Sequence, residues 1–342
     1  MRVLITGGAG YIGSHTIVEL CAAGHDVVVV DNLCNSSEES LRRVERITGK
    51  SIPFFRVDCT DGQSLSAVFS KTKPDAVIHF AALKSVNESV AQPLRYFSNN
   101  VNSTLVLCQV MQQHGVKNLI FSSTAAVYGT PSELPLRETS SAGQTVTNPY
   151  GRSKYIVEQI LHDLKASDPT WCITILRYFN PIGAHKSGLI GEDPHGIPNN
   201  LLPYISQVAV GKRSVVHVFG NDYDTVDGTG VRDYIHVVDL AKGHLAALEH
   251  LETGNAINLY NLGTGHGTSV MQLIHAFEKA CGHDIAYEIS PRRPGDVAAC
   301  FANAEKAAQE LGWKAQKTIE DACVDAWLWQ SQNPHGYEQN RQ

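Results

Sequence analysis

Short runs of apolar, mostly β-branched residues alternate with longer amphipathic stretches along the first half of the chain. Continuous apolar runs are typical of strands covered on both faces of a parallel sheet, whereas helices need a longer, periodic pattern. The runs predict strands at 3–7, 26–31, 53–58, 76–82, 118–124 and 172–179. The stretches between them predict helices at 12–23, 36–47, 63–71, 92–114 and 149–166. This alternation predicts an α/β fold with a doubly wound parallel sheet and right-handed crossovers.

The alternation ends near residue 180. Glycine, proline and asparagine crowd residues 181–200, and shorter elements are predicted beyond them at 215–220, 235–251 and 257–263. We therefore expect two parts, a nucleotide-binding domain over 1–180 and a smaller α/β substrate-binding region over 181–342. The second part is expected to form the far wall of a cleft, with some chain crossing between the two. Residues 333–342 are expected to form a loose tail.

Composition and charge narrow the class of protein. The chain has 342 residues, 43% of them hydrophobic and 18% charged, and a formal net charge of -6, so no basic field favours nucleic acid. Eight cysteines without a CxxC pair argue against a disulfide framework or a zinc site, and no metal is expected. No apolar run reaches the roughly 18 residues that a membrane span needs. The N-terminus has no signal-peptide pattern. These features predict a cytoplasmic protein that binds neither nucleic acid nor membrane.

A glycine-rich turn follows the first predicted strand and precedes a helix. Gly7-x-x-Gly10-x-x-Gly13 is a variant of the dinucleotide fingerprint, in which glycines allow a tight turn and close approach of backbone N–H groups to a pyrophosphate. The predicted sheet is therefore of the Rossmann type. Asp31 ends the second strand, where a carboxylate accepts ribose hydroxyls, and no arginine follows it, which favours NAD over NADP. Asp58 ends the third strand, either as a simple turn cap or as an adenine contact.

A second motif joins a tyrosine and a lysine. Tyr150 and Lys154 are four residues apart on a predicted helix, so their side chains share one face. A nearby ammonium and a cationic nicotinamide would favour the phenolate and lower the Tyr150 pKa towards neutrality. Tyr150 is then the expected base that takes a proton from a sugar hydroxyl while hydride passes to NAD. Thr124, at the end of a strand, is the expected group that holds that oxygen or relays its proton.

These motifs together resemble those of the extended short-chain dehydrogenase/reductase family, which carries a glycine turn, a Ser or Thr and a Tyr-x-x-x-Lys pair in this order. Within that family the chain resembles the UDP-glucose 4-epimerases from residue 2 to about residue 337. The tracts that carry this likeness lie at 31–37, 79–86, 176–185, 196–211, 219–223 and 227–241.

The resemblance implies reversible epimerisation of UDP-glucose and UDP-galactose at carbon 4, through a transient 4-keto sugar and tightly bound NAD, in galactose metabolism. Related dehydratases carry an Asp-Glu pair after the hydroxyl residue, where this chain has Ala125 and Ala126. Methyl groups do no acid–base chemistry, which argues against elimination and, by a similar argument, decarboxylation. The alternatives left open are another NAD-dependent nucleotide-sugar epimerase, dehydratase or decarboxylase, and a non-catalytic NAD-sensing regulator.

The resemblance also implies the residues that contact each ligand. The implied cofactor contacts, besides Gly7, Gly10, Gly13, Tyr150 and Lys154, are Tyr11, Ile12, Asp31, Asn32, Leu33, Cys34, Asn35, Ser36, Asp58, Cys59, Phe80, Ala81, Ala82, Leu83, Lys84, Asn99 and Phe179. The implied contacts of the UDP-hexose are Thr124, Asn180, Asn200, Leu201, His217, Val218, Phe219, Arg232, Arg293, Asp296 and Cys300. Guanidinium groups suit a pyrophosphate, but the sequence leaves open whether Arg292 or Arg293 faces it. A homodimer through the helices at 92–114 and 149–166 is also implied.

Cys300 departs from some members of the resembled family, which carry a bulky tyrosine at this position. A cysteine leaves more room beside the 2-substituent of the sugar. We therefore expect the chain to accept UDP-N-acetylglucosamine and UDP-N-acetylgalactosamine as well. The alternative is a buried apolar cysteine without consequence for specificity.

Overall fold

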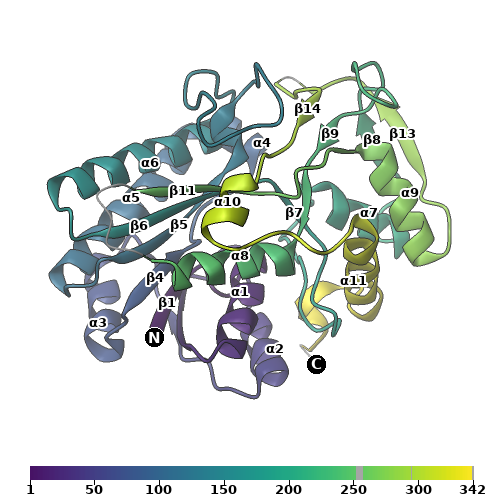
Figure 1. Cartoon of the computed structure of the whole chain (residues 1–342). Helices are drawn as coiled ribbons and strands as arrows, with labels where there is room; N and C mark the ends of the chain where they lie inside the picture. Colours follow the sequence, from purple (N-terminus) through teal and green to yellow (C-terminus); the bar gives the residue numbers. More distant parts are fainter. Residues whose placement is uncertain (252–256, 294, 341–342) are drawn as a thin grey trace.

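The computed structural model of the chain describes residues 1–251, 257–293 and 295–340. Its centre is a sheet of seven parallel strands (Figure 1). In spatial order the strands are β11 (Asn258–Leu262), β6 (Cys172–Tyr178), β5 (Asn118–Thr124), β4 (Ala76–His79), β1 (Arg2–Thr6), β2 (Asp26–Asp31) and β3 (Phe54–Arg56). The predicted α/β class with a doubly wound, Rossmann-type sheet is confirmed.

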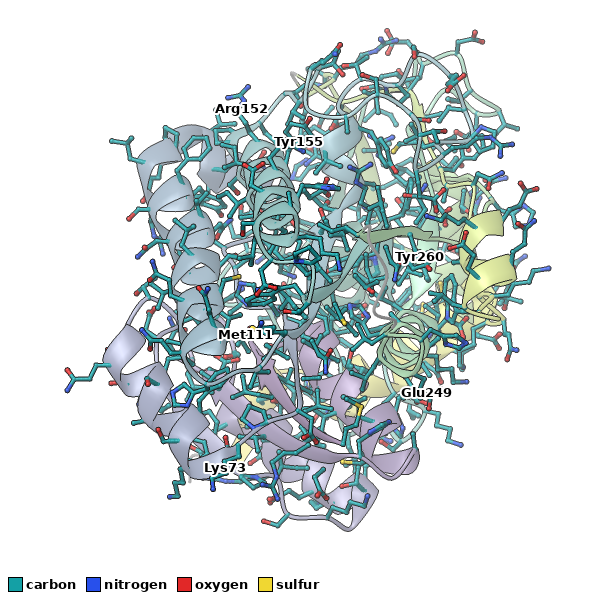
Figure 2. The ribbon with its side chains drawn as sticks, turned by 60° about the vertical axis from the view of Figure 1, so that its left-hand side comes forward. Lys73, Met111, Arg152, Tyr155, Glu249 and Tyr260 are labelled. Carbon is teal, nitrogen blue, oxygen red and sulfur yellow. The ribbon has the colours of Figure 1, made fainter. Side chains whose placement is uncertain are left out.

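Helices cover both faces of this sheet, as the apolar character of its strands requires. One face carries α1 (Tyr11–Ala22), α2 (Glu38–Thr48) and α8 (Val237–Glu249). The other carries α3 (Gly62–Thr72), α5 (Pro93–Gln113) and α6 (Pro149–Ser167), and Figure 2 shows α5 and α6 side by side. Two separate apolar clusters, one under each helical layer, form the core of this part of the molecule.

A smaller region lies beyond the carboxyl ends of the strands, on the right of Figure 1. A third apolar cluster packs its helices α7 (Leu201–Ala209), α9 (Val270–Cys281) and α11 (Ile319–Gln332) against short strands, which gives the region a core of its own. Its elements are β7 (Asn180–Ile182), α7 (Leu201–Ala209), β8 (Val216–Phe219), β9 (Val231–Arg232), β10 (Tyr234–His236), β12 (Thr268–Ser269), α9 (Val270–Cys281), β13 (Tyr287–Ser290), β14 (Ala299–Cys300) and α11 (Ile319–Gln332). The remaining short elements are α4 (Val86–Ala91), η1 (Ala125–Tyr128), α10 (Glu305–Glu310) and η2 (Gly336–Asn340).

Four of the six predicted strands match the structure to within one residue at each end, whereas β3 and β4 are shorter than expected. The chain also crosses back after residue 180. Strand β11 pairs in parallel with β6, and α8 packs against α1. Part of the second half of the sequence therefore belongs to the sheet, which is chain crossing of the kind that the sequence suggested.

The expectation of a loose C-terminal tail is wrong for the residues that the structure describes up to 338. Asn333 and Tyr337 are buried, and the Tyr337 ring lies against Trp329 with ring centroids 4.8 Å apart. The guanidinium of Arg43 lies 5.1 Å from the centre of the Tyr337 ring, and its Nη1 donates to Asn333 Oδ1 at 2.7 Å. Aromatic and cation–π packing therefore fixes the segment around Tyr337 to α2. Residues 341–342 lie outside the described part.

The sheet reverses its direction of winding at β1. This strand lies between β2 and β4, so the chain runs outwards through β2 and β3 and then returns to the other side. Ligands of open α/β sheets bind at the carboxyl ends of the strands beside such a reversal. Within the described residues, no helix combines the length and apolar character needed to cross a membrane.

Candidate active site

A cavity of about 600 Å³ lies at that edge of the sheet, between the carboxyl ends of the strands and the smaller region. Every predicted cofactor or substrate contact lines it except Leu33 and Val218. Leu33 packs against the core cluster below α1 and α2, and Val218 is buried in the core of the smaller region. Alternate residues of a strand face opposite sides, so His217 and Phe219 of β8 line the cavity while Val218 between them does not. The ligand contacts expected of Leu33 and Val218 stay predictions.

The glycine turn is shaped for close approach of a ligand backbone. Gly7 has a φ of 71°, in the left-handed region, and a Cβ there would lie 2.8 Å from the Ala81 nitrogen. A Cβ on Gly13 would lie 2.5 Å from the Gly7 oxygen. Gly10 caps α1 without a side-chain hydrogen bond, so no side chain of the cap occupies the first N–H groups of the helix, which border the cavity. These features fit a bound pyrophosphate.

Two aspartates follow neighbouring strands on this side of the cavity. Asp31 is buried and accepts hydrogen bonds from the Ala9 and Leu33 amides and from the Ser36 hydroxyl at 2.9–3.1 Å. Burial raises its pKa, and these hydrogen bonds oppose the rise. Asp58 accepts from Thr60 and from the Asn32 amide while it also borders the cavity. Asp58 therefore caps a local turn at the same time as it faces the cavity.

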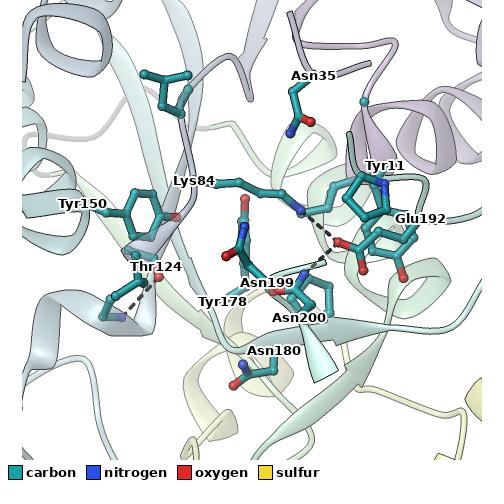
Figure 3. Close-up of a pocket in the computed structure, with 18 of the residues that line it drawn as sticks. Tyr11, Asn35, Lys84, Thr124, Tyr150, Tyr178, Asn180, Glu192, Asn199 and Asn200 are labelled. Atoms are coloured by element: carbon teal, nitrogen blue, oxygen red, sulfur yellow. Dashed lines mark hydrogen bonds and ion pairs between the residues drawn. The ribbon is translucent and has the colours of Figure 1, made fainter. Parts of the chain in front are cut away.

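Tyr150 and Thr124 lie next to each other on one side of the cavity (Figure 3). Asn148 and Pro149 start α6 just before Tyr150, since the Asn148 side chain accepts from the Gly151 amide at 2.8 Å. The Thr124 hydroxyl accepts from the Ala126 amide at 3.2 Å, so this residue caps η1 as well as facing the cavity. Helix α6 and strand β5 thus bring the two hydroxyl groups together.

Lys154 lies below Tyr150 on the same helix face and is buried. Its Nζ donates to the Ser122 carbonyl oxygen at 2.8 Å and lies 4.8 Å from the centre of the Phe121 ring. Burial lowers the pKa of Lys154 to about 7, and the Glu158 carboxylate one turn further along opposes that shift. The predicted pair is therefore assembled around the end of β5.

The sequence predicts a lowered Tyr150 pKa from Lys154 and a nicotinamide ring together, so that prediction concerns the protein with NAD bound. Burial raises the pKa of Tyr150 to about 12, and the hydrogen bond with Thr124 opposes only part of that rise. Desolvation disfavours the charged phenolate, and in the protein alone the Thr124 hydrogen bond is too weak to offset it. A further positive charge close to the ring is needed before Tyr150 acts as a base near neutral pH.

On the far wall, a carboxylate holds two arginines beside the cavity. Asp296 lies 3.9 Å from Arg232 Nη2 and 3.3 Å from Arg293 Nε, while Arg293 stacks over the Phe219 ring at 4.2 Å. Arg292 does not line the cavity, because its side chain pairs with Asp222 at 2.7 Å and stacks on the Tyr223 ring. The structure therefore brings Arg293, and not its neighbour, to the cavity.

Lys84, Glu192 and Asn200 form a polar group opposite Tyr150 in Figure 3. Glu192 Oε1 accepts from Lys84 Nζ at 2.9 Å and from Asn200 Nδ2 at 2.7 Å. The Tyr11 hydroxyl donates to the Gly183 carbonyl oxygen at 2.7 Å and so ties α1 to the smaller region. These bonds link the two walls.

Sequence reasoning missed several residues of the cavity wall, notably Tyr178, Glu192 and Tyr337. Tyr178 sits at the end of β6, where the strand-end position was a usable signal. Glu192 and Tyr337 come from a loop and from the C-terminal segment, for which no local pattern indicates a position. Cys300, Ala125 and Ala126 line the cavity as well. No group of three His, Cys, Asp or Glu side chains suited to a metal ion occurs in the described residues.

Comparison with known proteins agrees with this geometry. The family model described as "NAD dependent epimerase/dehydratase family" matches residues 3–263. The chain belongs to this family. The match includes the glycine turn, the Tyr150–Lys154 pair and Arg232. It ends one residue after β11, the last strand of the central sheet along the chain.

Within the NAD dependent epimerase/dehydratase family the likeness extends over almost the whole chain. The UDP-glucose 4-epimerase of Haemophilus influenzae is 58% identical over 337 residues, 98% of this chain and 99% of that protein. The enzyme of the same name from Bacillus subtilis is 55% identical over 338 residues, 99% of each chain. A crystal structure of UDP-glucose 4-epimerase from Bifidobacterium longum in complex with NAD+ and UDP is 57% identical, with a TM-score of 0.95 over 98% of this chain and 100% of that chain.

Proposed function

We propose that this protein is an NAD-dependent isomerase that interconverts UDP-glucose and UDP-galactose by epimerisation at carbon 4. The observation that carries this proposal is one continuous cavity with the glycine turn at one end, Tyr150 and Thr124 in the middle and Arg293 at the other. A cofactor and a nucleotide sugar therefore have room to meet at one pair of hydroxyl groups. The names of the relatives, and NAD+ and UDP in the Bifidobacterium longum complex, support the same activity.

The glycine turn, Asp31 and Lys84 are the residues that would hold NAD. Backbone N–H groups at the start of α1 suit its pyrophosphate, and the Asp31 carboxylate suits its ribose hydroxyls. When bound, NAD supplies the hydride acceptor for oxidation at carbon 4, the donor for the return step, and a positive ring charge. Because each cycle regenerates the cofactor, the protein retains it between turnovers.

Tyr150 takes the proton of the sugar 4-hydroxyl and returns it at the end of the cycle. Its pKa of about 12 in the protein alone falls when a cationic ring lies beside the phenol, since an adjacent positive charge favours the phenolate. Lys154 in its charged form acts in the same direction from below. Thr124 holds the sugar oxygen in reach of Tyr150. Loss of this proton, with transfer of a hydride from carbon 4 to the NAD held in the cavity, would give a transient 4-keto sugar.

The nucleotide stays anchored while the hexose turns over. Arg232 and Arg293, held by Asp296, suit the pyrophosphate of UDP, because guanidinium groups form paired bonds with phosphate oxygens. With the nucleotide fixed at the far wall, rotation of the hexose presents its other face for the return step. Tight contacts to UDP and few to the sugar are the requirement for epimerisation.

Two other activities are less well supported. Ala125 and Ala126 line the cavity just after Thr124, where a dehydratase needs acid and base groups, so elimination has no catalyst there. A non-catalytic NAD-sensing regulator would have no use for the Tyr150–Lys154 pair. An absorbance spectrum with bound cofactor, together with nicotinamide fluorescence that appears on adding UDP-sugar, separates an enzyme of this kind from a regulator.

The decisive test is conversion of UDP-galactose to UDP-glucose by the purified protein without added cofactor. We expect both sugars at equilibrium and no 4-keto-6-deoxy sugar or carbon dioxide. Absence of UDP-glucose from a preparation that carries bound NAD would overturn the proposal. The matched control is Arg292→Met, which removes a guanidinium that pairs with Asp222 and stacks on the wall residue Tyr223 but does not itself line the cavity.

We further propose that UDP-N-acetylglucosamine and UDP-N-acetylgalactosamine are substrates too, since Cys300 leaves room in the wall beside Arg232. Replacing it by tyrosine adds a phenol ring to a wall residue that has only a thiol. Cys300→Tyr should therefore lower turnover of the acetylated pair relative to the plain pair by about tenfold or more. An unchanged ratio would refute this role.

We propose that residues 1–180 bind NAD and residues 181–342 bind the UDP-sugar, while α8 and β11 from the second half of the sequence complete the first part.

We also propose a cytoplasmic homodimer through α5 and α6. Apolar side chains on these helices are exposed, including Leu94 (82%), Leu105 and Ile156. Ile156→Glu should shift the sedimentation coefficient from that of a dimer to that of a monomer. A wild-type monomer at micromolar concentration would contradict the dimer.

A further inference from the structure

One oxygen atom, Glu192 Oε1, bonds to a side chain from each half of the cavity. It accepts from Lys84, which follows β4 in the sheet, and from Asn200, which caps α7 in the smaller region (Figure 3). Only 8% of the Glu192 side chain is exposed, against 45% of Lys84. The carboxylate is therefore the fixed member of the group, and Lys84 is the member with more freedom.

The loop that carries Glu192 is held from behind by the C-terminal segment. The Tyr337 hydroxyl lies 3.3 Å from both the nitrogen and the oxygen of Gly191, and the Tyr337 amide donates to Asp193 at 2.8 Å. Gly191 lies so close to Trp329 that a Cβ would stand 2.4 Å from its ring. Both neighbours of Glu192 are thus fixed without any help from a ligand.

The chemistry of the two donors gives this arrangement a use. An ammonium has three N–H groups and an amide has two, so Lys84 and Asn200 each keep at least one donor for a ligand after bonding to Glu192. Lys84 and Asn200 both border the cavity, Lys84 after strand β4 of the sheet and Asn200 at the start of α7 in the smaller region. A single carboxylate oxygen therefore orients one free donor group from each half of the cavity.

We propose that Glu192 is a positioning residue that couples the binding of NAD to the binding of the UDP-sugar; this rests on the function proposed above. A phosphate that fixes Lys84 also fixes the Glu192 carboxylate, and the ordering of Asn200 then costs less when the second ligand binds. The coupling is reciprocal, so each ligand strengthens the binding of the other by the same factor. The device retains NAD most firmly while the oxidised sugar is in the cavity.

The experiment measures the dissociation constant of UDP for NAD-loaded and NAD-stripped protein by calorimetry. Wild type should bind UDP about fivefold or more tightly when NAD is present. Glu192→Gln keeps the shape of the side chain and loses its charge. The ratio of the UDP dissociation constant of NAD-stripped protein to that of NAD-loaded protein should therefore fall to within about twofold of unity. The matched control is Asp168→Asn, which breaks a Lys117–carboxylate pair of 2.8 Å at the opposite edge of the sheet and should keep the wild-type ratio.

A general loss of packing would weaken the binding of both ligands without removing the coupling between them. The ratio of the two UDP dissociation constants therefore separates a positioning role of Glu192 from a structural one. Lys84→Met is a second test, because it leaves the Glu192–Asn200 bond in place. In this variant too the ratio of the two dissociation constants should fall near unity, while the NAD-stripped variant binds UDP as wild type does. A wild-type ratio retained in Glu192→Gln or in Lys84→Met overturns the inference, as does a ratio of unity in wild type. Epimerisation by wild type in the same preparation shows that the proposed function stands in either case.

Discussion

Beneath the candidate base, a buried ion pair joins helix α6 to strand β6. Glu158 accepts from Arg177 through Nε at 3.0 Å and Nη2 at 2.5 Å, and from the Ser123 hydroxyl at 2.5 Å. The exposed fractions of the two charged side chains are 1% and 6%. Glu158 also lies one helical turn from Lys154 and raises its pKa. Glu158→Gln therefore tests a structural and an electrostatic role at once.

The magnitude follows from what the substitution leaves behind. Removing one charge of a buried, hydrogen-bonded pair typically costs about 3–5 kcal/mol, because the other charge stays desolvated without its partner. Arg177 is poorly placed to find another, since its Nη1 is already buried without a hydrogen bond in the described structure. Glutamine keeps one oxygen acceptor, so we expect a loss of about 3 kcal/mol in the free energy of unfolding.

The assay is urea denaturation of wild type and variants with equal NAD content. The double variant Glu158→Gln with Arg177→Met removes the stranded charge and should recover part of the lost stability. In the pH profile of kcat, loss of the carboxylate lowers the pKa of Lys154 further below its ordinary value. Lys154 is charged only below its pKa, so the alkaline fall in activity should move to lower pH.

Three results would refute this reasoning. A stability within about 1 kcal/mol of wild type would show that Arg177 finds compensation. A double variant less stable than the single one would show that the stranded charge is not the cause. An unmoved alkaline limb would show that Glu158 does not act on Lys154 during turnover.

Three further substitutions separate the parts of the cavity. Tyr150→Phe should lower kcat about 10²–10⁴-fold, the usual contribution of a general base, and near-normal turnover would remove Tyr150 from that role. Gly13→Ala should weaken retention of NAD by about tenfold or more, because a Cβ would stand 2.5 Å from the Gly7 oxygen. Gly10→Ala is the milder control at 3.2 Å, and equal losses would contradict the steric argument. Arg293→Met should raise KM for UDP-galactose about tenfold, by loss of a charge-assisted bond, whereas the same change at Arg292 should leave it within about twofold; the reverse order would refute the assignment.

Local patterns were sufficient for the sheet and for the motifs attached to it. Strands β1, β2, β5 and β6 lie where their continuous apolar runs predict, since a strand covered on both faces needs apolar residues at every position. The glycine turn, Asp31, Thr124 and Tyr150 all follow strand ends or helix starts. Because carboxyl ends of parallel strands share one edge, their meeting follows from the fold class.

Contacts between distant segments did not follow from any pattern. The choice between Arg292 and Arg293 depends on Asp222 and Asp296, which draw adjacent guanidinium groups in different directions. The burial of Tyr337 depends on Arg43, almost the whole chain away. The neighbouring sequence alone predicts a solvated charge or a loose tail for such residues, because it contains no information about which distant residues they contact.

The sequence by itself determined the strand–helix order, the glycine turn and the presence of a Tyr–Lys pair, because these depend on residues close together in the chain. The tertiary structure alone decided how burial acts on that pair, since burial raises the pKa of Tyr150 and lowers that of Lys154. It alone also joined Lys84 and Asn200 through Glu192. Desolvation and long-range hydrogen bonding are properties of the packed molecule, and no local stretch of sequence contains them.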